Sequence, residues 1–125
     1  MILLTVDEMI ELHQKLVDAT GGSAGLRDRG LLESAVYSVD ASFDDIERYP
    51  TVEEKAARLA YSLIHNHAFV DGNKRIGVYI MLTFLEVNGI RLECTDDELV
   101  HVGLSVADGS MDYEQLLAWV REHRI

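Results

Sequence analysis

The chain has 125 residues, 48% of them hydrophobic, which is enough to build one globular domain over residues 1–125. It carries 22 acidic and 11 basic residues, so its formal net charge of -11 repels nucleic acid and anionic membranes and favours a basic partner. Cys94 is the only cysteine, which excludes an intramolecular disulfide. The longest mainly apolar stretch, Ile76 to Leu85, covers about half of a membrane span. We therefore expect a cytoplasmic protein that contacts neither nucleic acid directly nor a membrane.

The N-terminal third predicts two helices joined by a glycine-rich loop. Thr5 followed by Glu8 has the form of a capping box, and apolar residues then recur at helical spacing until Gly21-Gly22 ends the helix. A loop over 21–30 leads to a second helix, for which Asp28 is the expected cap. The apolar face of this helix consists of Leu31, Leu32, Ala35, Val36 and Val39.

Two further helices flank a short break at residues 67–72. A capping box at Thr51 starts the third helix, over 52–65, which has a regular apolar stripe. The fourth helix, over 73–87, is apolar on nearly all sides and is closed by Asn88-Gly89, so it belongs in the centre of a bundle.

The C-terminal third predicts a short extended piece and two more helices. Ile90 to Glu93 is expected to be extended, and helices near 96–107 and 112–123 follow. The first of these starts behind a capping box at Thr95, and the second behind a weaker version of it, Asp112 followed by Gln115. The predicted fold is therefore all-α, a compact bundle of about six helices around the buried helix 73–87.

The residues with chemical potential lie in the break, where the chain reads HAFVDGNKR. His67 is the one side chain here that suits general-base work near neutral pH. Asp71 can hold a hard cation such as Mg²⁺. Gly72 precedes a helix N-terminus, whose free N–H groups bind anions, and Lys74 and Arg75 add positive charge. Together these groups predict phosphoryl chemistry, in which an anion is bound and a hydroxyl is activated.

Each of these residues also has an ordinary structural explanation. A histidine at a helix end often caps it, and Asp-Gly-Asn is a common turn sequence. Lys-Arg at a helix start is usually solvated surface, although its charge opposes the helix dipole. The ordered combination is much more specific than any single member.

The segment resembles the Doc-type form of the Fic motif, His-x-Phe-x-Asp-Gly/Ala-Asn-Lys-Arg, and every defined position matches. The stretch over 21–35 is similar to the glycine-rich loop and second helix of that family. Chain length, helix order and the Asn88-Gly89 stop extend the resemblance over nearly the whole chain. On these features the chain resembles the Doc branch of the Fic/Doc superfamily.

The resemblance implies a role for each motif residue. His67 would be the general base on a Thr or Ser hydroxyl of a target protein, Phe69 would anchor the loop in the core, and Asp71 would hold Mg²⁺. The phosphates of ATP, or of another nucleoside triphosphate, would bind to Gly72, Asn73, Lys74 and Arg75. The catalytic set that the family implies is His67, Asp71, Lys74 and Arg75.

Two positions separate this chain from relatives that transfer AMP, which resemble His-x-Phe-x-x-Gly-Asn-Gly-Arg-x-x-Arg. Here Lys74 replaces the glycine after the asparagine, and Val78 replaces the second arginine. The Doc branch shares both features and is thought to place the γ-phosphate at the histidine, which implies kinase activity on elongation factor Tu. AMP transfer and a catalytically idle partner-binding module remain alternatives.

The resemblance also implies a toxin that is restrained by a separate antitoxin with a disordered tail. No segment matches the inhibitory Ser/Thr-x-x-x-Glu-Gly/Asn helix of some relatives, although Thr83 to Asn88 has a near-miss spacing. We expect the tail to fold as an amphipathic helix in an exposed apolar groove near residues 21–50, with DNA contacted only through the partner.

Other interpretations of the histidines have less support. His65-Asn66-His67 spells HNH, but the nuclease of that name uses dispersed residues, and the acidic charge opposes DNA binding. His65 and His67 could bind zinc, but no third ligand is evident nearby. The histidines expected at the surface or an interface are His13, His101 and His123, whereas Trp119 is expected in the core.

Overall fold

Six α-helices and a short β-hairpin make up the part of the chain that the structure describes, residues 1–23, 25–40, 42–43 and 46–125 of a computed structural model. The helices are α1 (Val6–Thr20), α2 (Arg29–Asp40), α3 (Val52–Asn66), α4 (Asn73–Val87), α5 (Asp96–Asp108) and α6 (Tyr113–His123). The predicted all-α bundle is confirmed. Between α2 and α3 lie two antiparallel two-residue strands, β1 (Ser42–Phe43) and β2 (Ile46–Glu47), which were not predicted from the sequence.

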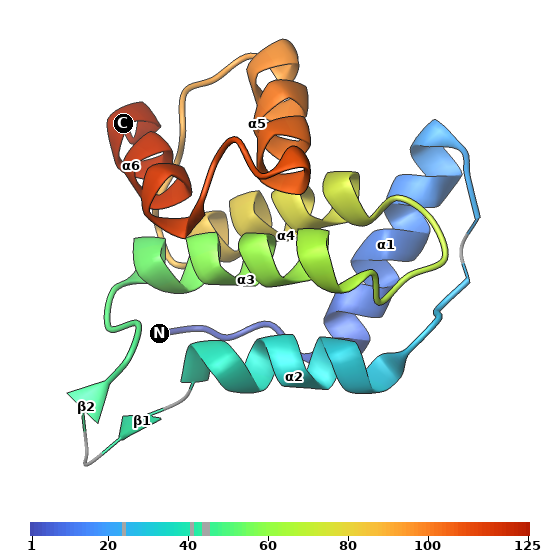
Figure 1. The fold of residues 1–125 in the computed structure, drawn as a ribbon, viewed down its shortest axis with the longest axis horizontal. Coiled ribbons are helices and arrows are strands. Elements are labelled where there is room, and N and C mark those ends of the chain that lie inside the picture. The colour runs from blue at the N-terminus through green and yellow to red at the C-terminus, as the bar shows by residue number, and fades with distance from the viewer. Residues whose placement is uncertain (24, 41, 44–45) are drawn as a thin grey trace.

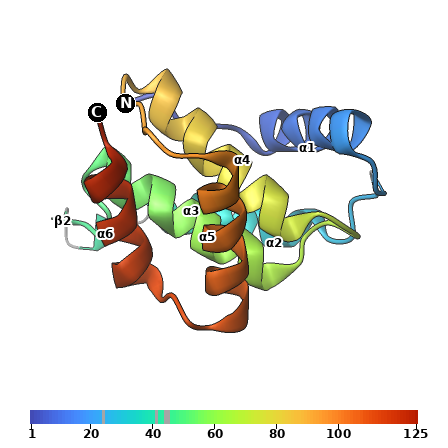
Figure 2. The ribbon, with the colours of Figure 1, turned by 90° about the horizontal axis from the view of Figure 1, so that it is seen from above.

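The helices α3 and α4 lie side by side at the centre and run in opposite directions (Figure 1). The loop over 67–72 joins them at one end. On one side of this pair, α2 packs against α3, and on the other side α5 and α6 pack against α4 and α3, respectively (Figures 1 and 2). Helix α1 contacts both α4 and α2. The loop that contains the motif is therefore flanked by α1 and by the connection from α1 to α2.

The core is centred on the α3–α4 pair. Helix α4 buries an almost continuous series of apolar side chains, as expected for the central helix, but α3 buries a comparable set. Gly77 allows the two helices to approach closely, since a Cβ atom there would lie 2.7 Å from Ile64 Cγ1 and 3.2 Å from the Ala60 carbonyl oxygen. Within the described residues, no helix combines the length and the hydropathy needed to cross a bilayer.

Four of the six helix starts have the side-chain caps that the sequence predicts. Thr5, Thr51, Thr95 and Asp112 each accept a hydrogen bond from the N–H three residues further along the chain. Helix α4 differs, because its N-cap is Gly72 and no side chain caps it. Its first backbone N–H groups are therefore not occupied by a capping side chain.

The extended piece after α4 pairs with the C-terminus. Leu92 forms an isolated antiparallel bridge with Arg124, and the N–H of Glu93 donates to the carbonyl oxygen of His123. The Arg124 guanidinium also pairs with the largely buried Glu53 carboxylate at the start of α3. These contacts tie the C-terminal end of the chain to the central pair.

Candidate active site

His67 ends α3 in a left-handed backbone conformation. Its φ of 53° and ψ of 47° make it the one non-glycine residue with positive φ among the described residues. Histidine is among the few side chains that adopt this region with some frequency, and a strained residue of this kind is often found at a functional site. Its side chain is exposed. The sharp turn therefore ends the helix and leaves the imidazole accessible at the start of the loop.

The segment between α1 and α2 holds the outside of the loop. The N–H groups of Arg27 and Asp28 both donate to the Ala68 carbonyl oxygen, at 2.8 and 3.0 Å, and the Val70 N–H donates to the Gly25 carbonyl oxygen at 2.9 Å. The Arg27 guanidinium adds two bonds, from Nε to the His67 carbonyl oxygen at 2.7 Å and from Nη2 to that of Asn66 at 3.1 Å. The backbone on both sides of the His67 Cα is thus fixed.

Asn73 spans the inside of the loop. Its Oδ1 accepts from the Phe69 N–H at 3.1 Å, and its Nδ2 donates to the Phe69 carbonyl oxygen at 3.0 Å. The Phe69 side chain is 1% exposed, in agreement with its predicted anchoring role. Asn73 was expected to contact phosphate, but this geometry makes its side chain a brace for the loop. Its backbone N–H, at the start of α4, stays a candidate phosphate donor.

His13 of α1 packs against the loop, and the prediction that it lies at the surface or an interface is wrong. It is 1% exposed, its ring stacks on Phe69 with centroids 3.8 Å apart, and its Nε2 donates to the Asp71 carbonyl oxygen at 2.8 Å. The sequence contained a signal for this, because position 13 follows the buried Met9 by one helical turn. A single imidazole on α1 therefore fixes both the aromatic anchor and the carboxylate residue of the motif.

All six predicted site residues line one cavity of about 510 Å³ at the junction of α3 and α4. These residues are His67, Asp71, Gly72, Asn73, Lys74 and Arg75. Further lining comes from α3, the loop and α5, through Ile64, His65, Val70 and Ala107. The structure therefore brings the motif residues together around a single space.

Among the described residues that line the cavity, Asp71 is the only one with a carboxylate. Its Oδ1 accepts from the Gly72 N–H at 2.8 Å, and its Oδ2 lies 3.4 Å from the Ser23 N–H. A Cβ atom at Gly22, whose φ is 107°, would lie 2.6 Å from Asp71 Oδ2, so this position needs glycine for two reasons. No group of three or more His, Cys, Asp or Glu side chains within the described residues could hold a metal by itself. An Mg²⁺ ion at Asp71 would take its other ligands from phosphate oxygens and water, as it commonly does beside nucleotides.

The two cations of the motif stand on the uncapped first turn of α4. Arg75 Nη1 donates to Thr20 Oγ1 at 2.7 Å, which holds the guanidinium against the end of α1, near Gly22 and Gly72. Lys74 is exposed. One turn later Val78 is 7% exposed and packs beside Gly103 of α5. The cavity therefore has two positive side chains near the helix N-terminus, whereas Val78 lies outside its lining, between α1, α4 and α5.

Residues 3–85, which include the helical bundle up to α4 and the loop that lines this cavity, match the model of the Fic/DOC family. The chain belongs to the Fic/DOC family. It is 44% identical over 79 residues to Toxin Doc of Mycolicibacterium smegmatis, which covers 63% of this chain and 61% of that relative. It is 26% identical over 118 residues to Protein kinase doc of Escherichia phage P1, which covers 94% and 92%. The first alignment thus spans about three fifths of the mycobacterial toxin, and both relatives support the Doc branch of the family.

Replacing His13 by alanine should destabilise the protein by about 2–4 kcal/mol, because it opens a buried space under Phe69 and leaves the Asp71 carbonyl oxygen unpaired. His13→Phe, which can keep the stacking but cannot donate, should cost less. Urea unfolding followed by circular dichroism measures both changes. His101→Ala, at an exposed position on α5, is the control and should change stability by no more than about 0.5 kcal/mol. An equal effect at the two histidines would contradict the supporting role of His13.

Proposed function

We propose that this chain is the toxin of a toxin–antitoxin system and that it transfers the γ-phosphate of a nucleoside triphosphate, ATP by family resemblance, to a Thr or Ser hydroxyl of a protein. The observation that carries the proposal is the single cavity that His67, Asp71, Lys74 and Arg75 share with the uncapped start of α4. A general base, a cation ligand and an anion-binding helix end are the components that phosphoryl transfer requires. The names Toxin Doc and Protein kinase doc of the two relatives support it.

His67 would act as the general base. Its exposed ring can accept the proton of an acceptor hydroxyl that enters the cavity from solvent. The hydroxyl oxygen then attacks the γ-phosphorus, the bond from this phosphorus to the β–γ bridging oxygen breaks, and the electron pair leaves with the nucleoside diphosphate. The fixed backbone around His67 restricts the positions that the imidazole can take while the acceptor binds, which favours a productive geometry.

The start of α4 would bind the phosphates. Its N–H groups and the positive end of its dipole attract anions, and Lys74 and Arg75 add two full charges at the same end. Asp71 and phosphate oxygens would together hold Mg²⁺, which when bound neutralises charge on the phosphates. Two cations at a helix N-terminus are unfavourable without an anion, so their placement is itself support for a phosphate ligand.

Phosphate transfer is the reaction that positions 74 and 78 favour over AMP transfer. The Lys74 side chain occupies space beside the loop where AMP-transferring relatives have only a hydrogen atom. The buried Val78 cannot neutralise a phosphate in the place of their second arginine. AMP transfer and an idle binding module are the remaining alternatives, and elongation factor Tu as the acceptor rests on family resemblance alone.

Replacing His67 by alanine should lower the rate of transfer by about 10²–10⁴ while the protein stays folded, since the base is lost but no core side chain is removed. His67→Asn is a second variant, because asparagine tolerates the left-handed backbone at this position. Label transfer from nucleotide to protein measures the rate, and circular dichroism measures the fold. Transfer by either variant at the parental rate would exclude His67 as the base.

An apolar groove between α1, α4 and α5 offers a place for the antitoxin tail. Its volume is about 500 Å³, and its apolar lining includes Leu16, Val78, Tyr79, Leu82, Leu99 and Leu104. Lys74 and Arg75 line both this groove and the cavity at the junction of α3 and α4, which we call the transfer cavity. We propose that an amphipathic helix of the antitoxin tail binds here and covers the two cations, which would block phosphate binding.

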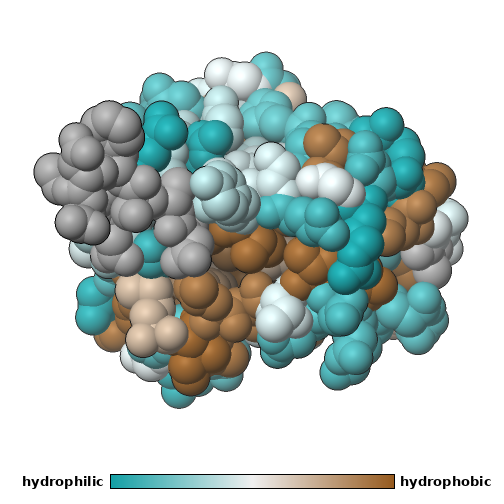
Figure 3. Space-filling view, turned by 90° about the horizontal axis from the view of Figure 1, so that it is seen from below, coloured by the Kyte–Doolittle hydropathy of each residue, from teal (hydrophilic) through white to brown (hydrophobic). Residues whose placement is uncertain are grey.

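The groove predicted from the sequence, near residues 21–50, stays a separate prediction, and part of that segment lies outside the described residues. Much of the apolar stripe of α2 is buried in the core. The part of α2 that lines the space beside α3 carries Ser34 and Ser38. The face on the α2 side does carry hydrophobic surface, but hydrophilic side chains interrupt it (Figure 3). The groove with the more continuous apolar lining is the one beside α5.

Replacing Leu104 by aspartate should abolish co-purification with the antitoxin, because it places a charge in the apolar groove from a side chain that is 48% exposed and so is not needed for folding. Tyr37→Asp, on the exposed face of α2 at 76% exposure, is the control and should leave the complex intact. Co-expression with the adjacent small open reading frame, followed by purification through a tag on this chain, measures the outcome. Loss of the partner from Tyr37→Asp alone would instead place the tail on α2.

A further inference from the structure

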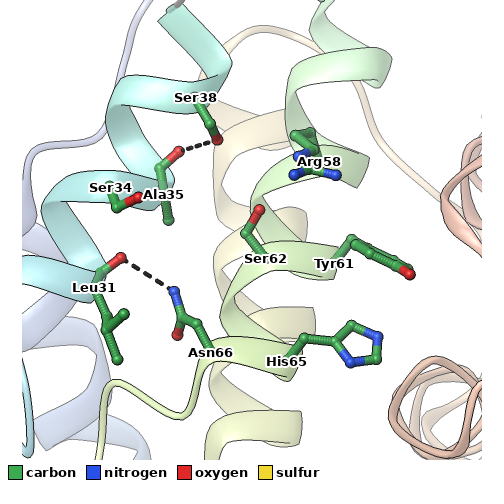
Figure 4. Close-up of a pocket in the computed structure, with 9 residues that line it drawn as sticks. All are labelled: Leu31, Ser34, Ala35, Ser38, Arg58, Tyr61, Ser62, His65 and Asn66. Carbon is green, nitrogen blue, oxygen red and sulfur yellow. Dashed lines mark hydrogen bonds between the residues drawn. The ribbon is translucent and has the colours of Figure 1, made fainter.

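A further pocket lies between α2 and α3 and has a volume of about 290 Å³ (Figure 4). Of its described lining residues, only His65 also lines the transfer cavity. Ser34 and Ser38 of α2 face Arg58 and Ser62 of α3 across it (Figure 4). Nothing in the phosphoryl-transfer scheme uses these residues. We name this space the α2–α3 pocket.

Arg58 is the side chain that calls for an explanation. Its Nε is buried and has no hydrogen-bond partner among the described residues. The guanidinium carbon lies 5.8 Å from the ring centre of Tyr49 and 5.7 Å from that of Tyr61, so two aromatic rings hold it in place. A buried guanidinium N–H without an acceptor is costly, and such a group commonly marks a missing water or ion. Stacking accounts for the position of Arg58 but not for its unused donor.

The rest of the lining suits an anion. Ser38 Oγ donates to the Ala35 carbonyl oxygen and Asn66 Nδ2 to that of Leu31, so both belong to the helical framework (Figure 4). The hydroxyls of Ser34 and Ser62 are further donors on the two walls. No carboxylate is among the lining residues that the structure describes, although the chain has 22 acidic residues. The α2–α3 pocket is thus a local donor site on a protein whose net charge is negative.

His65 connects the α2–α3 pocket with the transfer cavity, because it lines both. Arg58 and His67 are nine residues apart along α3 and its C-cap, which corresponds to about 13 Å at 1.5 Å per helical residue. An extended peptide covers this span in about four residues. His65 lies seven residues after Arg58 and so on the same face of α3, and a protein segment that passes over His65 from a hydroxyl at His67 can place another of its side chains over Arg58.

We propose that the α2–α3 pocket binds an acidic side chain of the acceptor protein, about four residues from the hydroxyl that is modified. Arg58 binds the carboxylate through its two terminal nitrogens, a bidentate geometry that guanidinium and carboxylate groups favour, because its Nε is already covered by protein atoms. Ser34 and Ser62 donate to the remaining lone pairs. The proposal deepens the proposed function, because it gives the same enzyme a determinant of acceptor choice. It rests on that function only for the identity of the acceptor, since anion binding at Arg58 stands independently.

The first experiment asks whether the pocket binds carboxylate. Sodium acetate, and separately inorganic phosphate, is titrated at constant ionic strength while the arginine side-chain Nε–H signals are followed by NMR. The Arg58 signal should shift and saturate with acetate, and Arg58→Gln should weaken acetate binding by at least about tenfold, the effect of one charge-assisted hydrogen bond. Arg48 also stacks on Tyr49 but does not line the pocket, so Arg48→Gln is the matched control and should leave binding unchanged. An Arg58 signal that only drifts in parallel with that of Arg48 would overturn the anion site.

The second experiment separates an acceptor side chain from a free anion, without relying on transfer. The probe is the capped peptide Thr-Gly-Gly-Gly-Glu, and its matched control ends in glutamine. The glutamate peptide should shift the signals of both Arg58 and His67, and the Arg58→Gln variant should lose both shifts. If the peptide moves Arg58 alone, as acetate does, the pocket binds small anions and the acceptor proposal is wrong. Absence of transfer by the parent protein would count against the proposed function and would leave these binding results standing.

Discussion

The structure depends on a loop of six residues whose backbone is held from three directions. The segment over 25–28 pairs with its outer edge, the Asn73 amide spans its inside, and the buried His13 ring supports it from α1. A loop with this many backbone partners loses its conformational entropy during folding rather than when substrate binds. The backbone positions of His67 and Asp71 are therefore set in advance of any ligand, which restricts where the base can lie.

Helix α4 shows how the same constraint produces a binding site. Helices α1, α3, α5 and α6 have side-chain caps, whereas α4 begins at Gly72 with a left-handed turn and two cations. This arrangement weakens the isolated helix, since positive charge at the N-terminus opposes its dipole. Burial of α4 against α3 compensates for this local cost. Under the proposed function, nucleotide phosphate provides the missing negative charge, and an antitoxin helix in the neighbouring groove would compete for the same end.

Local sequence signals predicted most of the helices and the motif, and tertiary contacts explain what they missed. Thr5, Thr51, Thr95 and Asp112 revealed helix starts because a capping side chain acts within its own turn. The paired strands at 42–43 and 46–47 were missed because two-residue strands are too short for an alternating pattern. His13 was predicted at the surface or an interface because one polar residue on an apolar stripe does not show whether a buried hydrogen-bond partner is available to it. The bracing role of Asn73 and the place of the apolar groove depend on which helix faces pair, and no local pattern carries that information.

The most direct test asks which part of ATP is transferred to protein, the γ-phosphate or AMP. Cell lysate is incubated with the purified chain and Mg²⁺, together with ATP labelled either at the γ-phosphate or at the α-phosphate, and labelled protein is measured against a His67→Asn control. The account predicts that γ-label appears on an acceptor protein in excess of the control, and that α-label does not. Transfer of the α-label would show that AMP is the group moved, and label that does not depend on His67 would contradict the assignment of this cavity as the active site.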